Sequence, residues 1–355
     1  MKNFFNDLNL IGDQVTSSST DINSEPINHD NKEKLIEVLF VSSGNMKKLD
    51  IAPFIKIQGE SLKSENINVT YFKIRGKGIV GYLRNISELK KFLINKKFDL
   101  IHAHFTLSAW VVVLSFPKSP IVLSIMGTDA FGRLKKFSKV KIYNKYLTFL
   151  TILIQPFVSF IISKSPNIER HVWRKNKSTI LPNGVNLSKF DGERISFAKE
   201  LGLNPNKKYV LFLGNPNDVN KNFKLLEGLK EKLEQFEIEI INPYPVSHEV
   251  VVKLLSTVDV LVMCSVKEGS PNVVKEALAS NCKGVFTDVG DVKKIVEGVK
   301  GYAVINLDQA ELENAIHHVI AMKSCLGRHR IKELDLDSKI VAKKIRKIYD
   351  NLLNK

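Results

Sequence analysis

Short apolar runs alternate with stretches of helical periodicity along most of this chain, and the alternation starts twice. The first series begins with Ile36–Ser42, and the second begins with Tyr209–Gly214. Each run has the length of a strand buried on both faces, and the stretches between the runs are long enough for crossover helices. A strand–helix–strand order of this kind predicts parallel sheets covered by helices. We therefore expect an α/β protein with two Rossmann-like, doubly wound parallel-sheet domains that face a cleft.

The expected elements divide between the two halves of the chain. The strands are expected at Ile36–Ser42, Val69–Ile74, Phe98–His104, Ile121–Ile125, Phe157–Ser163, Tyr209–Gly214, Phe236–Ile241, Val258–Met263, Gly284–Thr287 and Tyr302–Ile305. The helices are expected at Ile51–Leu62, Leu83–Phe92, Leu107–Leu114, Arg133–Ile154, Phe223–Leu233, Val250–Leu255, Asn272–Ala279, Val292–Val296, Leu312–Met322 and Lys339–Leu353. The predicted organisation is a polar tail (1–33), an N-terminal domain (34–182), a linker (183–192), a C-terminal domain (193–337) and a final helix (338–355) that packs back on the N-terminal domain.

Composition and the absence of targeting signals indicate a cytoplasmic protein. The three cysteines, Cys264, Cys282 and Cys325, are too few and too scattered for a disulfide framework or a zinc site. The first thirty residues lack a basic region followed by an apolar core, so we expect no signal peptide. The most apolar run, Leu147–Ile162, is shorter than a membrane span and contains Pro156, which predicts a buried helix followed by a buried strand.

Positive charge is concentrated in one half of the chain. The net charge is +16, and residues 31–180 carry 26 Lys and Arg against 9 Asp and Glu. This half is therefore expected to meet an anionic partner, such as a membrane surface or nucleic acid. No zinc finger, RNP motif or basic coiled coil favours nucleic acid.

The segment Val258–Glu276 contains the strongest candidate for a ligand site. Its apolar strand leads into a Gly-containing turn and then into a helix from Asn272, for which Ser270 suits the N-cap and Pro271 the first position. Free backbone N–H groups at this helix start, together with the helix dipole, favour phosphate or another anion. An ordinary βα turn with a solvated Glu276 has the same local pattern, so the rest of the chain decides between the two interpretations.

Two carboxylates flank this anion site and match a family pattern. Because a carboxylate repels phosphate, Glu268 and Glu276 are each expected to accept hydrogen bonds from sugar hydroxyls instead. Together they form an E-x7-E pattern within Glu-Gly-Ser-Pro-Asn-Val-Val-Lys-Glu. With the segments Leu181–Phe190 (LPNGVNLSKF) and Thr287–Gly290 (TDVG), this pattern resembles the family 4 retaining glycosyltransferases of the GT-B fold. The resemblance runs from about Ile36 to the C-terminus.

The resemblance implies transfer of a sugar from a UDP- or GDP-linked donor to a glycan or lipid-linked acceptor, with retention of anomeric configuration and without a metal or other cofactor. It also implies that the N-terminal domain binds the acceptor and the C-terminal domain the nucleotide-sugar. Cell-surface polysaccharide synthesis is the expected setting.

By the same resemblance, Glu268 contacts the donor sugar, Glu276 binds the ribose and Lys221 clamps the diphosphate. The implied donor-binding set is Gly44, Asn215, Lys221, Glu268, Gly269, Ser270, Pro271, Asn272, Val273 and Glu276, with Asp129 and Lys224 as weaker candidates.

The chain departs from the family pattern at two positions. Many members carry Arg directly after Gly214, where this chain has Asn215, and many carry His where this chain has Met126. Lys221 or Lys224 would then hold more of the diphosphate charge, and the usual contact to the sugar is in doubt. Both subfamily variation and a loss of activity are consistent with these departures.

Three polar residues near strand ends have a structural as well as a functional interpretation. His102 and His104 fall on one face of their strand because side chains alternate, so at least one is expected to line the cleft. His104 is the better candidate and joins Glu268 and Lys221 as a catalytic candidate. Asp129 follows a strand end, where it suits either the cleft or an N-cap.

Basic and aromatic residues are interleaved over Arg133–Tyr146, within the positively charged half. A solvated helix face would produce the same pattern. The charge asymmetry favours reversible contact with an anionic membrane, at about 1 kcal/mol per basic residue near the surface.

Three other classes of function remain open from the sequence. A non-catalytic nucleotide-sugar-binding protein would keep the fold without turnover, and a GT-B nucleotide-sugar epimerase would need no acceptor. A nucleic-acid-binding protein is consistent with the charge but leaves the motifs unexplained.

Overall fold

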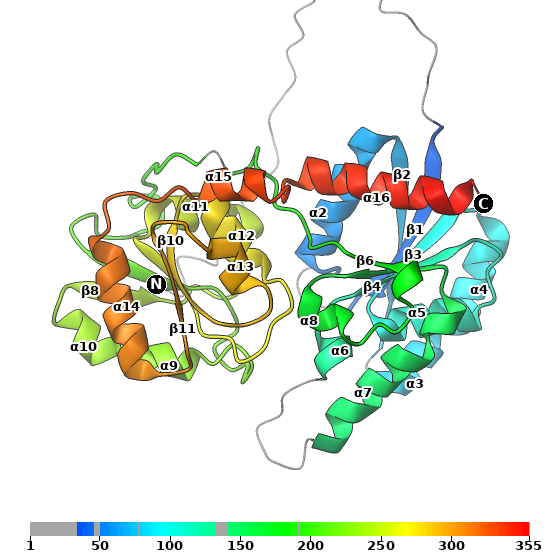
Figure 1. Cartoon of the computed structure of the whole chain (residues 1–355), viewed down its shortest axis with the longest axis horizontal. Helices are drawn as coiled ribbons and strands as arrows, with labels where there is room; N and C mark the ends of the chain where they lie inside the picture. The colour runs from blue at the N-terminus through cyan, green and yellow to red at the C-terminus, as the bar shows by residue number, and fades with distance from the viewer. Residues whose placement is uncertain (1–33, 46–49, 77, 133–140, 191, 355) are drawn as a thin grey trace, which may run out of the picture.

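The computed structural model describes residues 34–45, 50–76, 78–132, 141–190 and 192–354. Within these ranges the chain forms two parallel α/β domains side by side (Figure 1). The GT-B fold predicted from the sequence is therefore confirmed. The predicted tail over residues 1–33 and the basic residues Arg133–Val140 lie outside the described residues.

The N-terminal domain contains a six-stranded parallel sheet of order β2-β1-β3-β4-β5-β6. Its strands are β1 (Ile36–Ser43), β2 (Ile67–Ile74), β3 (Leu100–His104), β4 (Ile121–Ile125), β5 (Phe160–Ser163) and β6 (Ser178–Ile180). Its helices are α2 (Pro53–Leu62), α3 (Gly78–Leu83), α4 (Asn85–Asn95), α5 (Thr106–Leu114), α6 (Thr128–Phe131), α7 (Lys141–Leu153) and α8 (Pro166–Glu169).

The C-terminal domain contains a five-stranded parallel sheet of order β11-β10-β9-β7-β8. Its strands are β7 (Lys208–Phe212), β8 (Ile238–Ile241), β9 (Val260–Met263), β10 (Lys283–Thr287) and β11 (Tyr302–Ile305). Its helices are α9 (Phe223–Glu227), α10 (Lys230–Glu234), α11 (His248–Thr257), α12 (Asn272–Ala279), α13 (Val292–Val296), α14 (Gln309–Ala321) and α15 (Gly327–Glu333).

Strand order reverses once in each sheet, between β1 and β3 and between β7 and β9. Loops that leave adjacent strands at such a switch point diverge to opposite faces, which opens a crevice at the carboxyl edge. The loops after β7 and β9 therefore begin at the C-terminal domain's natural ligand position.

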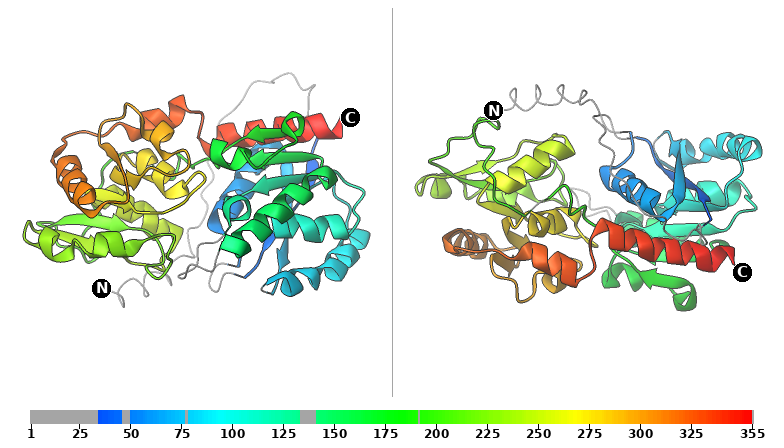
Figure 2. Two further views of the ribbon diagram at one scale, coloured as in Figure 1. Left: turned by 60° about the horizontal axis from the view of Figure 1, so that its bottom comes forward. Right: turned by 90° about the horizontal axis from the view of Figure 1, so that it is seen from above.

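Apolar side chains fill both faces of each sheet, as expected for strands buried on both sides. In β1, Leu39 and Val41 pack under α4 and α5, whereas Val38 and Phe40 face α2 and the last helix, α16 (Ser338–Leu353). Although α16 follows the C-terminal domain in sequence, it lies along the N-terminal domain (Figures 1 and 2).

Two segments connect the domains and are joined by hydrogen bonds. The Val185 N–H donates to the Leu336 carbonyl at 2.9 Å, and the Ser338 N–H donates to the Val185 carbonyl at 2.9 Å. A Cβ at Gly184 would lie 2.6 Å from the Ser338 Cα, so only glycine fits this close crossing. The two connecting segments thus lie side by side and are bonded through their backbones.

Some expected elements differ from those in the structure. The helix expected over Phe223–Leu233 is two helices, α9 and α10, which separate around Gly228, where the Gln309 side chain packs in the space that a Cβ would occupy. The fifth strand begins at Phe160 because Gln155–Phe157, which contains Pro156, forms a 3₁₀ turn. The helices α3, α6, α8 and α15 and the strand β6 were not expected.

No helix in the described part of the chain is both long enough and apolar enough to cross a membrane.

Candidate active site

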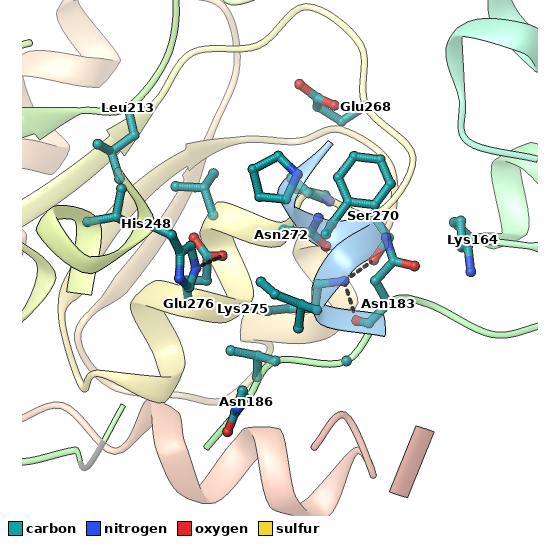
Figure 3. A pocket seen from close by; sticks show the side chains of 18 of the residues that line it. Lys164, Asn183, Asn186, Leu213, His248, Glu268, Ser270, Asn272, Lys275 and Glu276 are labelled. Atoms are coloured by element: carbon teal, nitrogen blue, oxygen red, sulfur yellow. Dashed lines mark hydrogen bonds and ion pairs between the residues drawn. The ribbon is translucent and has the colours of Figure 1, made fainter. Parts of the chain in front are cut away.

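A cavity of about 400 Å³ lies between the two domains and is lined by both of them and by the linker (Figure 3). Phe54, Met126 and Lys164 line it from the N-terminal domain. The C-terminal domain contributes Leu213, Lys221, His248, Glu268, Ser270, Pro271, Asn272, Val273, Lys275 and Glu276. A ligand here would contact the loops after β7 and β9, at the switch point of the C-terminal sheet.

The helix α12 begins at this cavity. Its first backbone N–H groups have no partner within the helix, and its N-terminal dipole is positive, so this end favours an anion. The prediction that Ser270 caps the helix is wrong: Pro271 occupies the N-cap position and makes no side-chain cap bond. Ser270 instead accepts a hydrogen bond from Lys275 Nζ at 3.2 Å.

Lys221 and Glu268 form an ion pair at the cavity, with Nζ and Oε1 2.7 Å apart. Two contacts between their loops hold them in register: the Val266 N–H donates to the Asn220 carbonyl at 2.8 Å, and Asn220 Nδ2 donates to the Lys267 carbonyl at 2.9 Å. The loops after β7 and β9 therefore present a cation and a carboxylate together.

Glu276 lies just over one turn after the start of α12, and its Oε1 is 3.1 Å from His248 Nε2. His248 is the first residue of α11, whose N-cap Ser247 accepts a hydrogen bond from the Val250 N–H. The edge of the His248 ring also meets Phe190, with centroids 5.9 Å apart. His248 thus holds the Glu276 carboxylate in a fixed orientation toward the cavity.

Two lysines at the cavity are almost completely buried. Lys275 Nζ donates to the Asn183 carbonyl at 2.7 Å, and burial lowers its pKa to about 8, although the nearby Asp291 and Glu276 charges oppose this. Burial and the positive charge of Lys275 lower the pKa of Lys164 to about 7. Lys275 therefore adds positive charge within α12, and Lys164 adds it on the N-terminal wall of the cavity.

A second cavity of about 460 Å³ continues the cleft on the other side of Glu268. Phe54, Met126 and Glu268 line both cavities, and Asn215 and Gly269 line the second. The two positions where the chain departs from the family pattern, Met126 and Asn215, therefore both reach the cleft.

One family model matches each domain. Residues 38–189 match "Glycosyltransferase Family 4", and residues 221–322 match "Glycosyl transferases group 1". The chain belongs to the family 4 GT-B glycosyltransferases.

A curated relative of the chain is the putative teichuronic acid biosynthesis glycosyltransferase TuaC of Bacillus subtilis (strain 168). The two are 27% identical over 219 residues, which cover 56% of this chain and 55% of the relative. The match thus spans about half the length of each protein.

Solved structures share the fold at low sequence identity. Sucrose-phosphate synthase from Thermosynechococcus elongatus has a TM-score of 0.74 and 16% identity, over 90% of this chain and 99% of that one. Anabaena Alr3699/HepE, solved in complex with UDP-glucose, has a TM-score of 0.66 and 14% identity, over 89% and 100% of the chains.

Most of the predicted donor-binding residues line the cleft. Across the two cavities these are Asn215, Lys221, Glu268, Gly269, Ser270, Pro271, Asn272, Val273 and Glu276. Gly44 lines neither of these cavities; its N–H donates to the Ile74 carbonyl at 2.8 Å. Lys224 is exposed on α9, away from both.

The structure does not bring His104 into either cavity. His102 and His104 do share one face of β3, with ring centroids 4.3 Å apart, but Phe40 covers His104 at 4.5 Å. Burial and the Lys164 charge lower the pKa of His104 well below its usual value. His104 is therefore a neutral core residue, and its catalytic assignment is not supported.

Asp129 is also buried rather than exposed to the cleft. Its carboxylate accepts hydrogen bonds from the N–H groups of Thr106, Met126 and Gly127 at 2.8–3.1 Å. Burial raises its pKa, although these three bonds oppose the shift. Asp129 therefore positions the loop that carries Met126.

His248, Lys164 and Lys275 line the cavity but were not among the site residues predicted from the sequence. The Ser247 N-cap before His248 was a usable signal, since it places the next residue at a helix start. Among the described residues, no group of three or more His, Cys, Asp or Glu side chains could hold a metal ion.

Proposed function

We propose that this chain is a retaining glycosyltransferase that transfers a sugar from a UDP- or GDP-linked donor to a glycan or lipid-linked acceptor in cell-surface polysaccharide synthesis. The observation that carries the proposal is the arrangement around α12: an anion-binding helix start with Lys221 and Glu268 on one side and Glu276 on the other. The names of the relatives agree with it, since HepE was solved with UDP-glucose and TuaC is named for teichuronic acid synthesis.

Each part of a nucleotide-sugar has a matching group in the cleft. Glu276, oriented by His248, would accept hydrogen bonds from the ribose hydroxyls. The α12 amides and Lys221 would hold the diphosphate, and Glu268 would bind hydroxyls of the sugar. Because Lys221 supplies the compensating positive charge, the proposed mechanism does not require a metal ion.

The proposed transfer takes place on one face of the sugar. The bond from the anomeric carbon to the diphosphate oxygen breaks, and the acceptor hydroxyl oxygen bonds to that carbon from the same side. The acceptor's proton passes to the leaving diphosphate oxygen. Lys221 and the helix amides stabilise the negative charge that develops there, and no side-chain nucleophile is required. Closure about the 183–192 linker would complete the site.

Nucleotide binding to wild type and to Glu276→Gln tests the donor site. Calorimetry with UDP, GDP and UDP-glucose should identify one preferred base. The substitution removes the carboxylate charge at nearly constant size, so that nucleotide should bind roughly 10- to 100-fold more weakly. Glu249→Gln, an exposed neighbour on α11, should bind like wild type. If no nucleotide binds the wild-type protein, the proposed function is wrong.

Met126 and Asn215 favour one alternative, a protein that binds nucleotide-sugars without transferring the sugar, because both departures reach the cleft. Selective nucleotide binding without hydrolysis or transfer would support this alternative.

We also propose that the N-terminal domain attaches to an anionic membrane. In addition to the basic residues expected from the sequence, α7 exposes Tyr146, Phe149 and Leu153 at helical spacing. Phe157 and Trp173 extend this apolar surface, and Trp173 is held by a hydrogen bond from Nε1 to the Ile152 carbonyl at 3.2 Å. Exposed apolar residues beside a basic segment are typical of a surface that enters the lipid interface.

A further inference from the structure

Lys164 has no hydrogen-bond or ion-pair partner among the described residues, although only 3% of it is exposed. It directly follows β5 and lines the central cavity from the N-terminal domain. In Figure 3 its side chain stands on the side of the cavity away from His248 and Glu276, with no dashed line to it. The other buried lysine, Lys275, is bonded to the Asn183 carbonyl and to Ser270 Oγ. A buried ammonium group without a partner is rare in folded proteins and calls for an explanation.

Two side-chain amides at the same cavity are also unsatisfied. Asn183 Oδ1 and Asn272 Oδ1 are buried and lack hydrogen-bond partners in the described part of the chain. Asn183 belongs to the linker and Asn272 begins α12, so the three groups come from three separate segments. Neither Asn183 Nδ2 nor Asn272 Nδ2 has a hydrogen-bond partner among the described residues, so each amide can donate to an anion in the cavity.

We propose that Lys164, Asn183 and Asn272 form an anion subsite for a carboxylate or phosphate group of a substrate, separate from the donor's diphosphate. The proposal rests on the proposed glycosyltransferase function. The diphosphate already has Lys221 and the α12 amides on the C-terminal wall, whereas Lys164 lies on the opposite wall. The acidic group is therefore carried either by the transferred sugar, as in a uronic acid, or by the acceptor, as in a lipid-linked phosphate.

The charges around Lys164 agree with an anionic ligand. The charged or titratable groups that act on it are Lys275 from α12 and the neutral His102 and His104 from β3. Without a ligand, two buried ammonium groups repel each other, and this repulsion with burial lowers the Lys164 pKa to about 7. A bound anion reverses both effects, so its binding should be accompanied by proton uptake near pH 7.

The test compares wild type with Lys164→Met, which keeps the side-chain length and removes the charge. Calorimetry with UDP, UDP-glucose, UDP-glucuronic acid and farnesyl diphosphate distinguishes the two sources of the anion. If the protein prefers GDP, the uridine ligands are replaced by GDP, GDP-mannose and GDP-mannuronic acid. Loss of roughly 10- to 100-fold in affinity for UDP-glucuronic acid alone assigns the subsite to an acidic donor sugar. The same loss for farnesyl diphosphate alone assigns it to a phosphate-bearing acceptor.

Two results would overturn the subsite. Equal weakening of UDP and of every other ligand would make Lys164 part of the diphosphate site, and unchanged affinity for all four would leave it without a ligand role. Lys118→Met, an exposed lysine of the same domain, is the matched control and should behave as wild type. If wild type binds no nucleotide but binds farnesyl diphosphate, and Lys164→Met weakens that binding, the anion subsite is supported and the proposed donor site is wrong.

Discussion

At the scale of single residues, the buried charge of Lys164 predicts an unusual dependence of stability on pH. Its pKa is about 7 in the folded chain, against roughly 10.4 in an unfolded chain. Between these values the unfolded state binds more protons, so the free energy of unfolding rises with pH. Below pH 7 the full penalty of burying the charge applies, and above about pH 10 it vanishes.

Lys164→Met should therefore be more stable than wild type near pH 6, by up to about 5 kcal/mol. The gain should shrink steadily as the pH approaches 10. Urea unfolding at pH 6, 8 and 9.5 measures the difference, with Lys118→Met as the neutral comparison. A gain that is the same at every pH would show that Lys164 is not buried as a titrating ammonium group.

Site residues were predictable from the sequence where they share one short segment. Glu268 and Glu276 lie in one turn and the helix that follows it, and the family resemblance named Lys221 from its position after the first strand of the C-terminal domain. Lys164 and His248 are brought to the cavity by separate elements, which no local pattern reveals. The alternation of side chains along a strand correctly predicted that His102 and His104 lie on one face of β3. Their burial depends on Phe40 and α16, which lie elsewhere in the sequence.

At the scale of elements, a buried polar contact of Tyr349 helps to hold α16 against the N-terminal sheet. Tyr349 is fully buried, and its hydroxyl lies 2.6 Å from His102 Nδ1. The other ring nitrogen, Nε2, lies 2.8 Å from Ser124 Oγ. The two contacts connect α16 to β3 and β4, in addition to the apolar packing of Val341 and Ile345.

Tyr349→Phe should destabilise the protein by about 1–3 kcal/mol, because it leaves a buried His102 nitrogen without a partner. Hydrogen exchange of the α16 amides should become faster, and thermal unfolding should begin at a lower temperature. Tyr244→Phe removes the same hydroxyl from an exposed side chain and should change neither measurement. Equal stability of the Tyr349 and Tyr244 variants would contradict the proposed fastening.

The periodicity of apolar residues predicted most helices and strands correctly. The predictions were wrong where contacts between distant residues change the local structure. The apolar spacing of Phe223–Leu233 is continuous, but the helix is divided near Gly228, where Gln309 Nε2 donates to the Leu225 carbonyl at 3.3 Å. Ser270 has the residue type of an N-cap, but Lys275 and the crossing linker determine where its side chain points. Both contacts come from tertiary packing and leave no signal in the local sequence.

At the scale of the whole molecule, charge and apolar surface are concentrated in the same domain. Residues 31–180 carry the excess of positive charge, and within the described residues the exposed apolar side chains of α7 belong to this domain. The cleft lies between this domain and the nearly neutral C-terminal domain. A membrane that held the N-terminal domain would leave the C-terminal domain free to close over a donor, while an acceptor in the membrane reached the cleft from the other wall.

Charge reversal in the basic segment tests this arrangement. Replacing Lys135, Lys136, Lys139 and Lys141 by Glu should weaken co-sedimentation with vesicles containing phosphatidylglycerol by well over 100-fold, at about 1 kcal/mol per removed charge. The matched control reverses four exposed lysines of the C-terminal domain, Lys199, Lys293, Lys300 and Lys323. Because both variants have the same net charge, a long-range effect of total charge would weaken them equally. If attachment is a local contact through the N-terminal domain, only the N-terminal charge-reversal variant should bind the vesicles more weakly. Adding Phe149→Ser to that variant should lower its remaining binding further, because it removes an apolar contact. Binding that ignored the anionic lipid content, or that survived the first reversal, would rule out this mode of membrane attachment.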